Sequence, residues 1–206
     1  MVHNPLAADG RIAPLKGLVL AGGFSRRMGA DKAGLEYDGK PQLTRAVALL
    51  QALLDDVYVS IRPDQAEEPV RSGFQQIPDL QQESGPGAGI LAAHAYNPQS
   101  AWLVIACDMP LLTHELLQQL IANRQPQAGI TAFCSANGKP EPLCAIYEPE
   151  RLAEFEKQAV EGKLPGPRTM FTLGGAALLE LPEPDVLQSA NTPQEFERIR
   201  SRKQAG

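Results

Sequence analysis

The sequence contains few cysteines, few aromatic residues and no long hydrophobic run. Three of its 206 residues are cysteine, and these are widely spaced, at positions 107, 134 and 144. An odd number of separated cysteines does not make a disulfide scaffold, so we expect reduced thiols in the core and a cytoplasmic protein. No apolar stretch approaches the roughly 20 residues that span a bilayer. The N-terminal residues lack a basic start before an apolar segment, so we expect no signal peptide and no membrane partner.

Excess positive charge is also absent. The formal net charge is −5 and the pI is near 5.3. Such a balance provides no global field that would attract nucleic acid or anionic lipid, and we expect no nucleic-acid partner. The three histidines share no metal-ligand spacing with the cysteines, so we expect no zinc site. A cluster of cations in this background therefore indicates a local function.

Short apolar runs alternate with helical patterns along the chain. The expected strands are residues 15–21, 57–61, 101–107, 130–134, 143–147 and 176–181. The expected helices are residues 41–54, 113–123, 149–161 and 193–203, and residues 163–168 read as a loop. This alternation predicts an α/β fold: a single-domain, three-layer α/β/α, Rossmann-like structure with a mostly parallel sheet. Functional residues are then expected just after the strands, where such sheets bind ligands.

We expect one domain over residues 1–206. Its core should extend over about residues 16–200, with mobile ends at residues 1–15 and 201–206. No internal repeat or long linker divides it.

A glycine loop with three cations follows the first expected strand. The stretch LVLAGGFSRRMGADK covers residues 18–32 and contains Gly22, Gly23, Arg26, Arg27 and Lys32. Glycine lets backbone N–H groups face an anion without a side chain in the way. The spacing is neither the dinucleotide G-x-G-x-x-G nor the P-loop G-x-x-x-x-G-K-[ST]. From the residues alone, a phosphate site and a simple solvated turn are equally open.

The same stretch resembles the signature of the molybdenum cofactor guanylyltransferases (the molybdopterin-guanine dinucleotide biosynthesis protein A type), L-A-G-G-x-S-x-R-M-G-x-D-K. All ten fixed positions match: Leu20, Ala21, Gly22, Gly23, Ser25, Arg27, Met28, Gly29, Asp31 and Lys32. The resemblance implies a nucleotide-diphospho-sugar transferase-like fold, with this loop wrapped around the triphosphate of GTP. It further implies that Arg27 and Lys32 act in catalysis by neutralising phosphate charge. The nucleotide-binding residues that it implies here are Leu20, Ala21, Gly22, Gly23, Ser25 and Lys32.

An aspartate ends the most apolar expected strand. In AWLVIACDMPLLT, Asp108 follows the buried run and precedes a proline. A carboxylate at this edge could bind Mg²⁺, which prefers oxygen ligands, or could cap the following turn. The resemblance places the family's magnesium-binding aspartate at this position. It therefore implies that Asp108 is a catalytic, nucleotide-binding and metal-binding residue, with Mg²⁺ as the cofactor.

Shorter segments extend the resemblance across residues 16–200. IPD ends at Asp79, a nucleotide-binding aspartate in the family, and GPGAGI begins at Gly85, which resembles the family's second glycine loop. On the pterin side, the resemblance indicates Glu141 in PEPLCAIYEP, Asn191 in SANTPQEF, and Arg168.

Three positions depart from the family pattern. Ser60, Ile61 and Ser189 stand where family members often carry asparagine. These departures concern the detailed contacts to the base and the ribose rather than the reaction class.

The resemblance implies an enzyme that transfers GMP from GTP to the terminal phosphate of molybdopterin, the molybdenum cofactor, and releases pyrophosphate. Further partners would be cofactor-insertion proteins and molybdoenzyme chaperones. A cytidylyltransferase of the same chemistry is an alternative, although its loop usually reads L-A-A-G and ends in P-K. Another small-substrate nucleotidyltransferase is less favoured, because sugar-phosphate enzymes usually continue R-L-x-P-L-T. A catalytically silent nucleotide-binding adaptor is the alternative of another class, and the retention of Lys32 and Asp108 argues against it.

Overall fold

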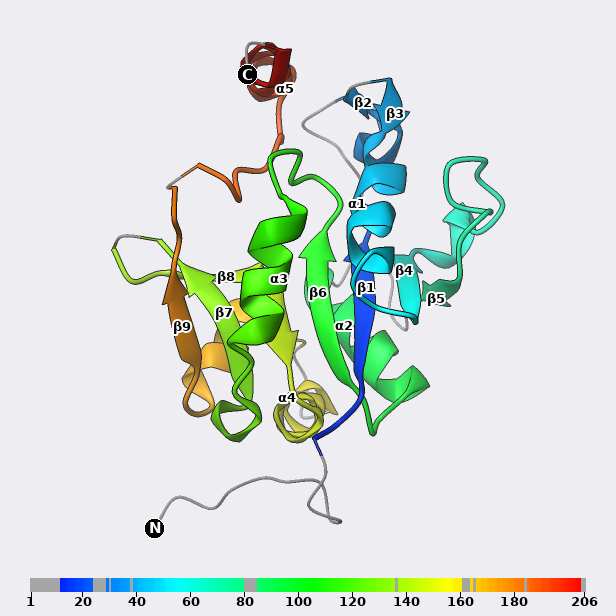
Figure 1. The fold of residues 1–206 in the computed structure, drawn as a ribbon. Helices are drawn as coiled ribbons and strands as arrows, with labels where there is room; N and C mark the ends of the chain where they lie inside the picture. The colour runs from blue at the N-terminus through cyan, green and yellow to red at the C-terminus, as the bar shows by residue number, and fades with distance from the viewer. Residues whose placement is uncertain are drawn as a thin grey trace.

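A seven-stranded sheet forms the centre of the molecule, with helices on both faces (Figure 1). The computed structural model describes residues 12–23, 29, 31–37, 39–79, 85–135, 137–160, 164, 166–183 and 185–204. The strands of this sheet are β1 (Leu15–Leu20), β4 (Val57–Ile61), β5 (Gln76–Pro78), β6 (Ala101–Ala106), β7 (Ile130–Cys134), β8 (Pro140–Tyr147) and β9 (Ala177–Glu180). Strands β2 (Glu36–Tyr37) and β3 (Lys40–Pro41) form a separate antiparallel pair.

The strand order of the large sheet is β5-β4-β1-β6-β8-β7-β9. Strands β5, β4, β1 and β6 run parallel to one another, and β7 runs parallel to β9. Strand β8 is antiparallel to both of its neighbours. The prediction of a mostly parallel α/β sheet is therefore confirmed.

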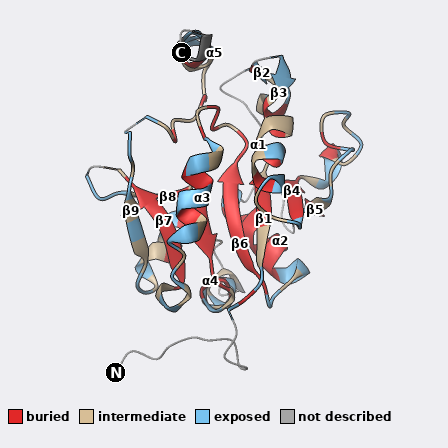
Figure 2. Cartoon of the chain, viewed as in Figure 1, coloured by how far each residue is buried: buried red, intermediate tan, exposed pale blue. Residues whose placement is uncertain are grey.

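Two apolar layers pack against the two faces of this sheet. Helices α1 (Gln42–Gln51) and α3 (His114–Ala122) cover one face, and α2 (Pro86–Tyr96) and α4 (Pro149–Val160) cover the other. Strand β6 shows why: Leu103 and Ile105 belong to the first layer, whereas Trp102 and Val104 belong to the second. Successive side chains of a strand point to opposite faces, so a strand buried on both faces must be apolar throughout (Figure 2).

The short helices and the C-terminal helix complete the fold. The 3-10 helices are η1 (Lys32–Gly34), η2 (Pro63–Gln65), η3 (Pro126–Ala128) and η4 (Pro167–Thr172), and the last element is α5 (Pro193–Gln204). Helix α5 begins with a capping box formed by Thr192 and Glu195. The Thr192 hydroxyl accepts a hydrogen bond from the Glu195 N–H (3.3 Å), and the Glu195 carboxylate accepts one from the Thr192 N–H (3.0 Å).

The expected boundaries need three corrections. The core, which was expected to begin at about residue 16, begins a few residues earlier. The carbonyls of Ala13 and Pro14 accept hydrogen bonds from Arg124 and Ala101, and Leu15 already lies in β1. At the other end, residues 201–204 continue α5. The loop expected at residues 163–168 runs into η4, because Pro167 suits the first turn of a helix.

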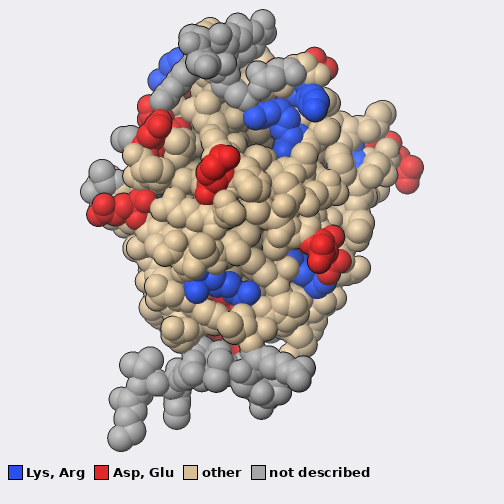
Figure 3. Space-filling view, in the orientation of Figure 1, with Lys and Arg blue, Asp and Glu red and all other residues tan. Residues whose placement is uncertain are grey.

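The three cysteines are free and buried, as the sequence predicts. Across the described residues, no helix has both the length and the apolar character to cross a bilayer. On the face shown in Figure 3, the described acidic and basic side chains are dispersed over the surface.

Candidate functional site

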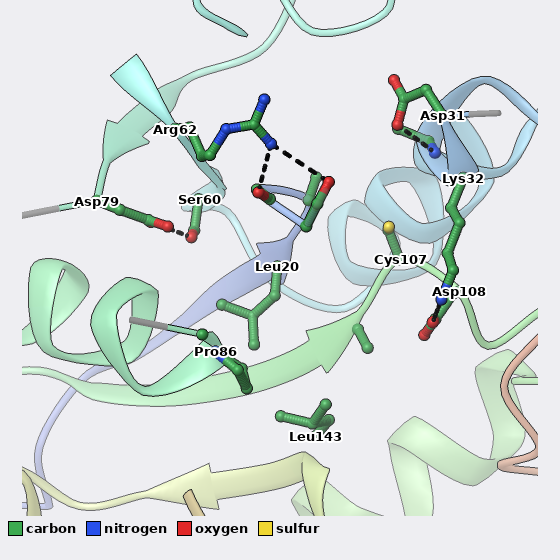
Figure 4. A pocket seen from close by; sticks show the side chains of 16 residues that line it. Leu20, Asp31, Lys32, Ser60, Arg62, Asp79, Pro86, Cys107, Asp108 and Leu143 are labelled. Atoms are coloured by element: carbon green, nitrogen blue, oxygen red, sulfur yellow. Dashed lines mark hydrogen bonds and ion pairs between the residues drawn. The ribbon is translucent and has the colours of Figure 1, made fainter. Parts of the chain in front are cut away.

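A pocket of about 350 Å³ lies at the carboxyl ends of β1, β4 and β6 (Figure 4). This is the edge of the sheet where the topology predicts ligand binding. Eight of the predicted site residues line it: Leu20, Ala21, Gly22, Gly23, Lys32, Asp79, Gly85 and Asp108. The predicted Ser25 and Arg27 lie outside the described residues. The structure thus brings together residues from four separate segments of the sequence.

Lys32 and Asp108 meet on one side of the pocket. The Lys32 Nζ lies 2.8 Å from the Asp108 Oδ2, and each side chain is less than one-fifth exposed. The same Nζ donates a hydrogen bond to the Asn191 Oδ1 at 2.6 Å. The Ala190 N–H also donates to the Asp108 carbonyl (3.0 Å), so the segment before α5 lies directly against Asp108. A cation and an anion are therefore held together on one side of the pocket.

The side chain of Arg62 contacts the two glycines that follow β1. Its guanidinium donates to the carbonyls of Gly22 (2.9 Å) and Gly23 (3.4 Å) and also pairs with Asp64. A Cβ at Gly22 would lie 3.0 Å from the Asp79 Oδ2 and 3.2 Å from the Arg62 nitrogen of the main chain. Position 22 therefore has no room for a larger residue unless Asp79 or β4 moves.

Asp79 lies on the opposite side of the pocket from Lys32 (Figure 4). Its Oδ1 accepts a hydrogen bond from the Ser60 hydroxyl at 2.7 Å. Burial raises the pKa of Asp79, although the Ser60 hydrogen bond and the charge of Arg62 act in the opposite direction. At Gly89 in α2, a Cβ would lie 2.9 Å from Leu20 and 3.1 Å from the Asp79 Oδ1. Glycine at position 89 thus lets α2 approach the carboxyl ends of β1 and β4 closely.

The two departures at the end of β4 have different surroundings. Ser60 lines the pocket, whereas Ile61 is fully buried in the layer with α1 and α3. Position 61 therefore faces the core, and Arg62, the next residue, occupies the pocket wall.

The three residues predicted on the pterin side divide into two groups. Asn191 contacts Lys32 and so lies on the Lys32 side of the pocket. Glu141 in β8 is half-buried, and its Oε1 accepts a hydrogen bond from the Leu143 N–H at 3.1 Å. Burial raises the pKa of Glu141, while the Leu143 hydrogen bond and the charge of nearby Arg168 oppose this rise. Arg168 is thus close enough to Glu141 for their charges to interact.

Sequence reasoning missed Arg62 as a pocket residue. It also did not predict that Ser60 hydrogen-bonds Asp79 or that Cys107 lines the pocket. Arg62 follows the last residue of a buried strand, and that position could have revealed it. Burial raises the pKa of the Cys107 thiol to about 12, and neighbouring Asp108 adds to the rise. Cys107 is therefore a neutral thiol at physiological pH and not a nucleophile.

Comparison with known sequences gives consistent matches. The profile of the family described as "MobA-like NTP transferase domain" matches residues 17–174. A "Molybdenum cofactor guanylyltransferase" of Pseudomonas paraeruginosa is 33% identical over 190 residues, which cover 90% of this chain and 94% of that protein. A "Molybdenum cofactor biosynthesis bifunctional protein" of Synechocystis sp. is 33% identical over 193 residues. The match covers 93% of this chain but 55% of that longer protein.

Solved structures share the fold. Molybdopterin-guanine dinucleotide biosynthesis protein A from Archaeoglobus fulgidus superimposes with a TM-score of 0.75 at 22% identity, over 93% of this chain and 100% of that chain. A CMP:2-keto-3-deoxy-manno-octonic acid synthetase in complex with CTP gives a TM-score of 0.73 at 14% identity, over 94% of this chain and 99% of that chain. At these identities the likeness shows a common α/β architecture.

Proposed function

The chain belongs to the MobA-like NTP transferase domain family, and from this membership and its pocket we propose that it is a molybdenum cofactor guanylyltransferase. It transfers GMP from GTP to the terminal phosphate of molybdopterin, as its molybdenum cofactor, and releases pyrophosphate. The relative from Pseudomonas paraeruginosa bears this name over nearly its whole length. The observation that carries the proposal is the contact of Lys32 with Asp108 at 2.8 Å beside the glycine loop.

The nucleotide binds across the carboxyl ends of β1, β4 and β6. The backbone of Gly22 and Gly23, together with Lys32, Ser25 and Arg27, holds the triphosphate. Asp79 and the helix that starts after Gly85 hold the nucleoside. Arg62 supports this arrangement because it fixes the carbonyls of both glycines.

The residues of the pocket fit a magnesium ion. Mg²⁺ is usually held by one or two carboxylates, by water and by the phosphates of the substrate. Asp108 offers such a carboxylate next to a phosphate-binding lysine. Among the described residues no cluster of three His, Cys, Asp or Glu side chains occurs, so a cage made wholly by the protein is not what the donor set offers. When bound, the ion would supply charge neutralisation for the triphosphate and the departing pyrophosphate.

The reaction needs positioning more than it needs a base. An oxygen of the acceptor phosphate forms a bond to the α-phosphorus, and the bond between the α-phosphorus and the bridging oxygen breaks with its electrons on pyrophosphate. A phosphate monoester is already anionic near neutral pH, so no strong general base is required. Lys32 and Arg27 hold the charge that collects on the leaving group, and Asn191 fixes the direction of the Lys32 ammonium.

The acceptor would lie toward β8, whose Leu143 lines the pocket, and toward η4, which packs against β8. Glu141, Arg168 and Asn191 contribute there, with Arg168 as the cation toward the pterin phosphate. The three buried free thiols suit a reducing compartment, and we assign the protein to the cytoplasm, where cofactor-insertion proteins and molybdoenzyme chaperones would receive its product.

A comparison of GTP with CTP tests the proposed function. A site that hydrogen-bonds guanine leaves polar groups unpaired when cytosine binds, so kcat/KM for GTP should exceed that for CTP by about two or more orders of magnitude. The measurement is pyrophosphate release with molybdopterin and Mg²⁺. Equal values or a preference for CTP would overturn the guanylyl assignment, and no release with any nucleotide would overturn nucleotidyl transfer.

A further inference from the structure

Arg71 is a buried arginine that lies behind the glycine loop. Its side chain is 1% exposed, and it does not line the pocket. It lies in the connection between η2 and β5, a segment without any motif that the sequence predicts to be functional. A fully buried guanidinium is costly unless its donors are used, so its partners indicate its role.

The guanidinium of Arg71 contacts both ends of the phosphate loop, which we define as residues 21–32. Its NH1 lies 2.6 Å from the Asp31 Oδ2, and its NH2 lies 3.0 Å from the Asp31 Oδ1. The NH2 and Nε also donate to the Ala21 carbonyl, at 2.9 Å and 3.3 Å. A further ion pair joins Arg71 to Glu68. One side chain thus fixes the first residue of the loop to its penultimate residue.

Asp31 connects the Arg71 contact to Lys32. Its Oδ1 caps η1 by accepting a hydrogen bond from the Ala33 N–H at 3.2 Å, and Lys32 is the first residue of η1. The bidentate pair therefore sets the orientation of the turn that presents the lysine.

Arg71 also compensates the negative charge of Asp31 in the pocket. Asp31 lines the pocket and would by itself repel a polyphosphate. Burial would raise the pKa of Asp31, but the hydrogen bond and charge of Arg71 outweigh it and lower that pKa. The carboxylate is therefore ionised, and Arg71 compensates its charge.

We propose that Arg71 is a positioning residue for the triphosphate: it clamps the phosphate loop from behind and neutralises Asp31, without touching the substrate. The inference rests on the proposed function for the identity of the anion. It goes beyond that function because Arg71 lies outside the glycine-loop signature and outside the pocket.

Two variants separate positioning from folding. Arg71→Lys keeps the charge and loses the bidentate fork, whereas Arg71→Met keeps the approximate volume and loses both. Each should fold, because Asp31 and Glu68 have side chains that are 41% exposed and can be hydrated once the arginine is gone.

Arg124 offers a matched control. It forms a bidentate pair with Glu148 (2.7 Å and 2.7 Å) and donates to the Ala13 carbonyl (2.9 Å), which repeats the chemistry of Arg71 at the amino end of β1. Arg124→Lys removes the bidentate partner of Glu148, whose side chain is only 2% exposed. Arg124→Lys should therefore cost at least as much stability as Arg71→Lys.

The experiment is calorimetric titration of GTP and of pyrophosphate, each with Mg²⁺, into wild type and the three variants, together with thermal unfolding and KM values. We expect Kd for both ligands, and KM for GTP, to rise by about tenfold to 100-fold in Arg71→Met. The rise should be smaller in Arg71→Lys and absent in Arg124→Lys, and KM for molybdopterin should change less than KM for GTP. Binding stoichiometry corrects for any unfolded fraction.

Two outcomes separate the positioning role of Arg71 from the proposed function. If wild type turns over GTP but both Arg71 variants bind it as tightly as Arg124→Lys does, the positioning role is overturned and the proposed function stands. If wild type binds neither GTP nor pyrophosphate, both are overturned.

Discussion

At the residue scale, Lys32 is the side chain on which most of the pocket depends. It contacts Asp108 and Asn191, and the proposed function assigns it the triphosphate. Lys32→Ala should lower kcat by about 10²–10³-fold, the usual effect of removing one preorganised donor from a transition state. Steady-state kinetics with GTP measures this. The matched control is Lys16→Ala, which breaks an ion pair with Asp56 at the start of β1, and a similar loss there would contradict the assignment.

A second residue-scale prediction concerns the pH dependence of Asp79. Burial raises its pKa above the ordinary 3.8, so the carboxylate gains a proton at a higher pH than an exposed aspartate does. Only the ionised form accepts hydrogen bonds from the nucleoside with both oxygens. The affinity for GTP should therefore weaken as the pH falls through this raised pKa, and Asp79→Asn should remove that acid limb. Titrations from about pH 7 down to about pH 4 measure it. If the affinity of Asp79→Asn for GTP still weakens at low pH as in wild type, the pH dependence belongs to a group other than Asp79.

At the scale of elements, the cap of α5 matters for the pocket as well as for the helix. Thr192 caps α5, and the residue before it, Asn191, contacts Lys32. Thr192→Ala should cost about 1 kcal/mol of stability, as N-cap losses do, and should also raise KM for GTP. Thr113→Ala removes the same kind of cap from α3, where the hydroxyl accepts from the Leu116 N–H. Chemical denaturation and kinetics of both variants separate the effects, since equal changes in KM would disprove a special role for α5.

The elements also show where sequence patterns succeed. Strands β4 and β7 have the predicted bounds, because each is a short run that is buried throughout. Strand β5 was not predicted, because Gln76, Ile77 and Pro78 are too few to show a pattern. Among the described strands it lies at the edge of the sheet and pairs only with β4. Its importance lies in the residue that follows it, Asp79, which the resemblance to a family motif identified and periodicity did not.

At the scale of the whole molecule, much of the hydrophobic core lies away from the pocket. Leu103 lies at the centre of β6 and is fully buried, away from the pocket. Leu103→Ala should lower the free energy of unfolding by about 2–5 kcal/mol, while kcat/KM per folded molecule stays unchanged. Leu178→Ala is the control, because its side chain is 43% exposed in β9 and its loss should be nearly neutral. Thermal unfolding and active-site titration test this, and a loss of kcat/KM per folded molecule in Leu103→Ala would show that the core and the site are coupled.

The sequence predicted the class of fold and eight pocket residues, but it did not predict how they are connected. Lys32 pairs with a residue 76 positions away, and Arg71 acts on residues 40 and 50 positions away. Such contacts depend on the order of strands in the sheet, which local periodicity does not encode. Arg71 in particular lies in a connection of polar residues where an arginine normally faces solvent, so its burial could be learned only from the structure.

The contact between Lys32 and Asn191 joins residues 159 positions apart. During translation the glycine loop leaves the ribosome early, whereas the amide that orients its lysine is made near the end of the chain. A nascent chain can therefore complete much of the sheet before it has a finished pocket. The pocket acquires its final shape only when synthesis has passed residue 191, so the acquisition of nucleotide affinity would report that this last segment has docked.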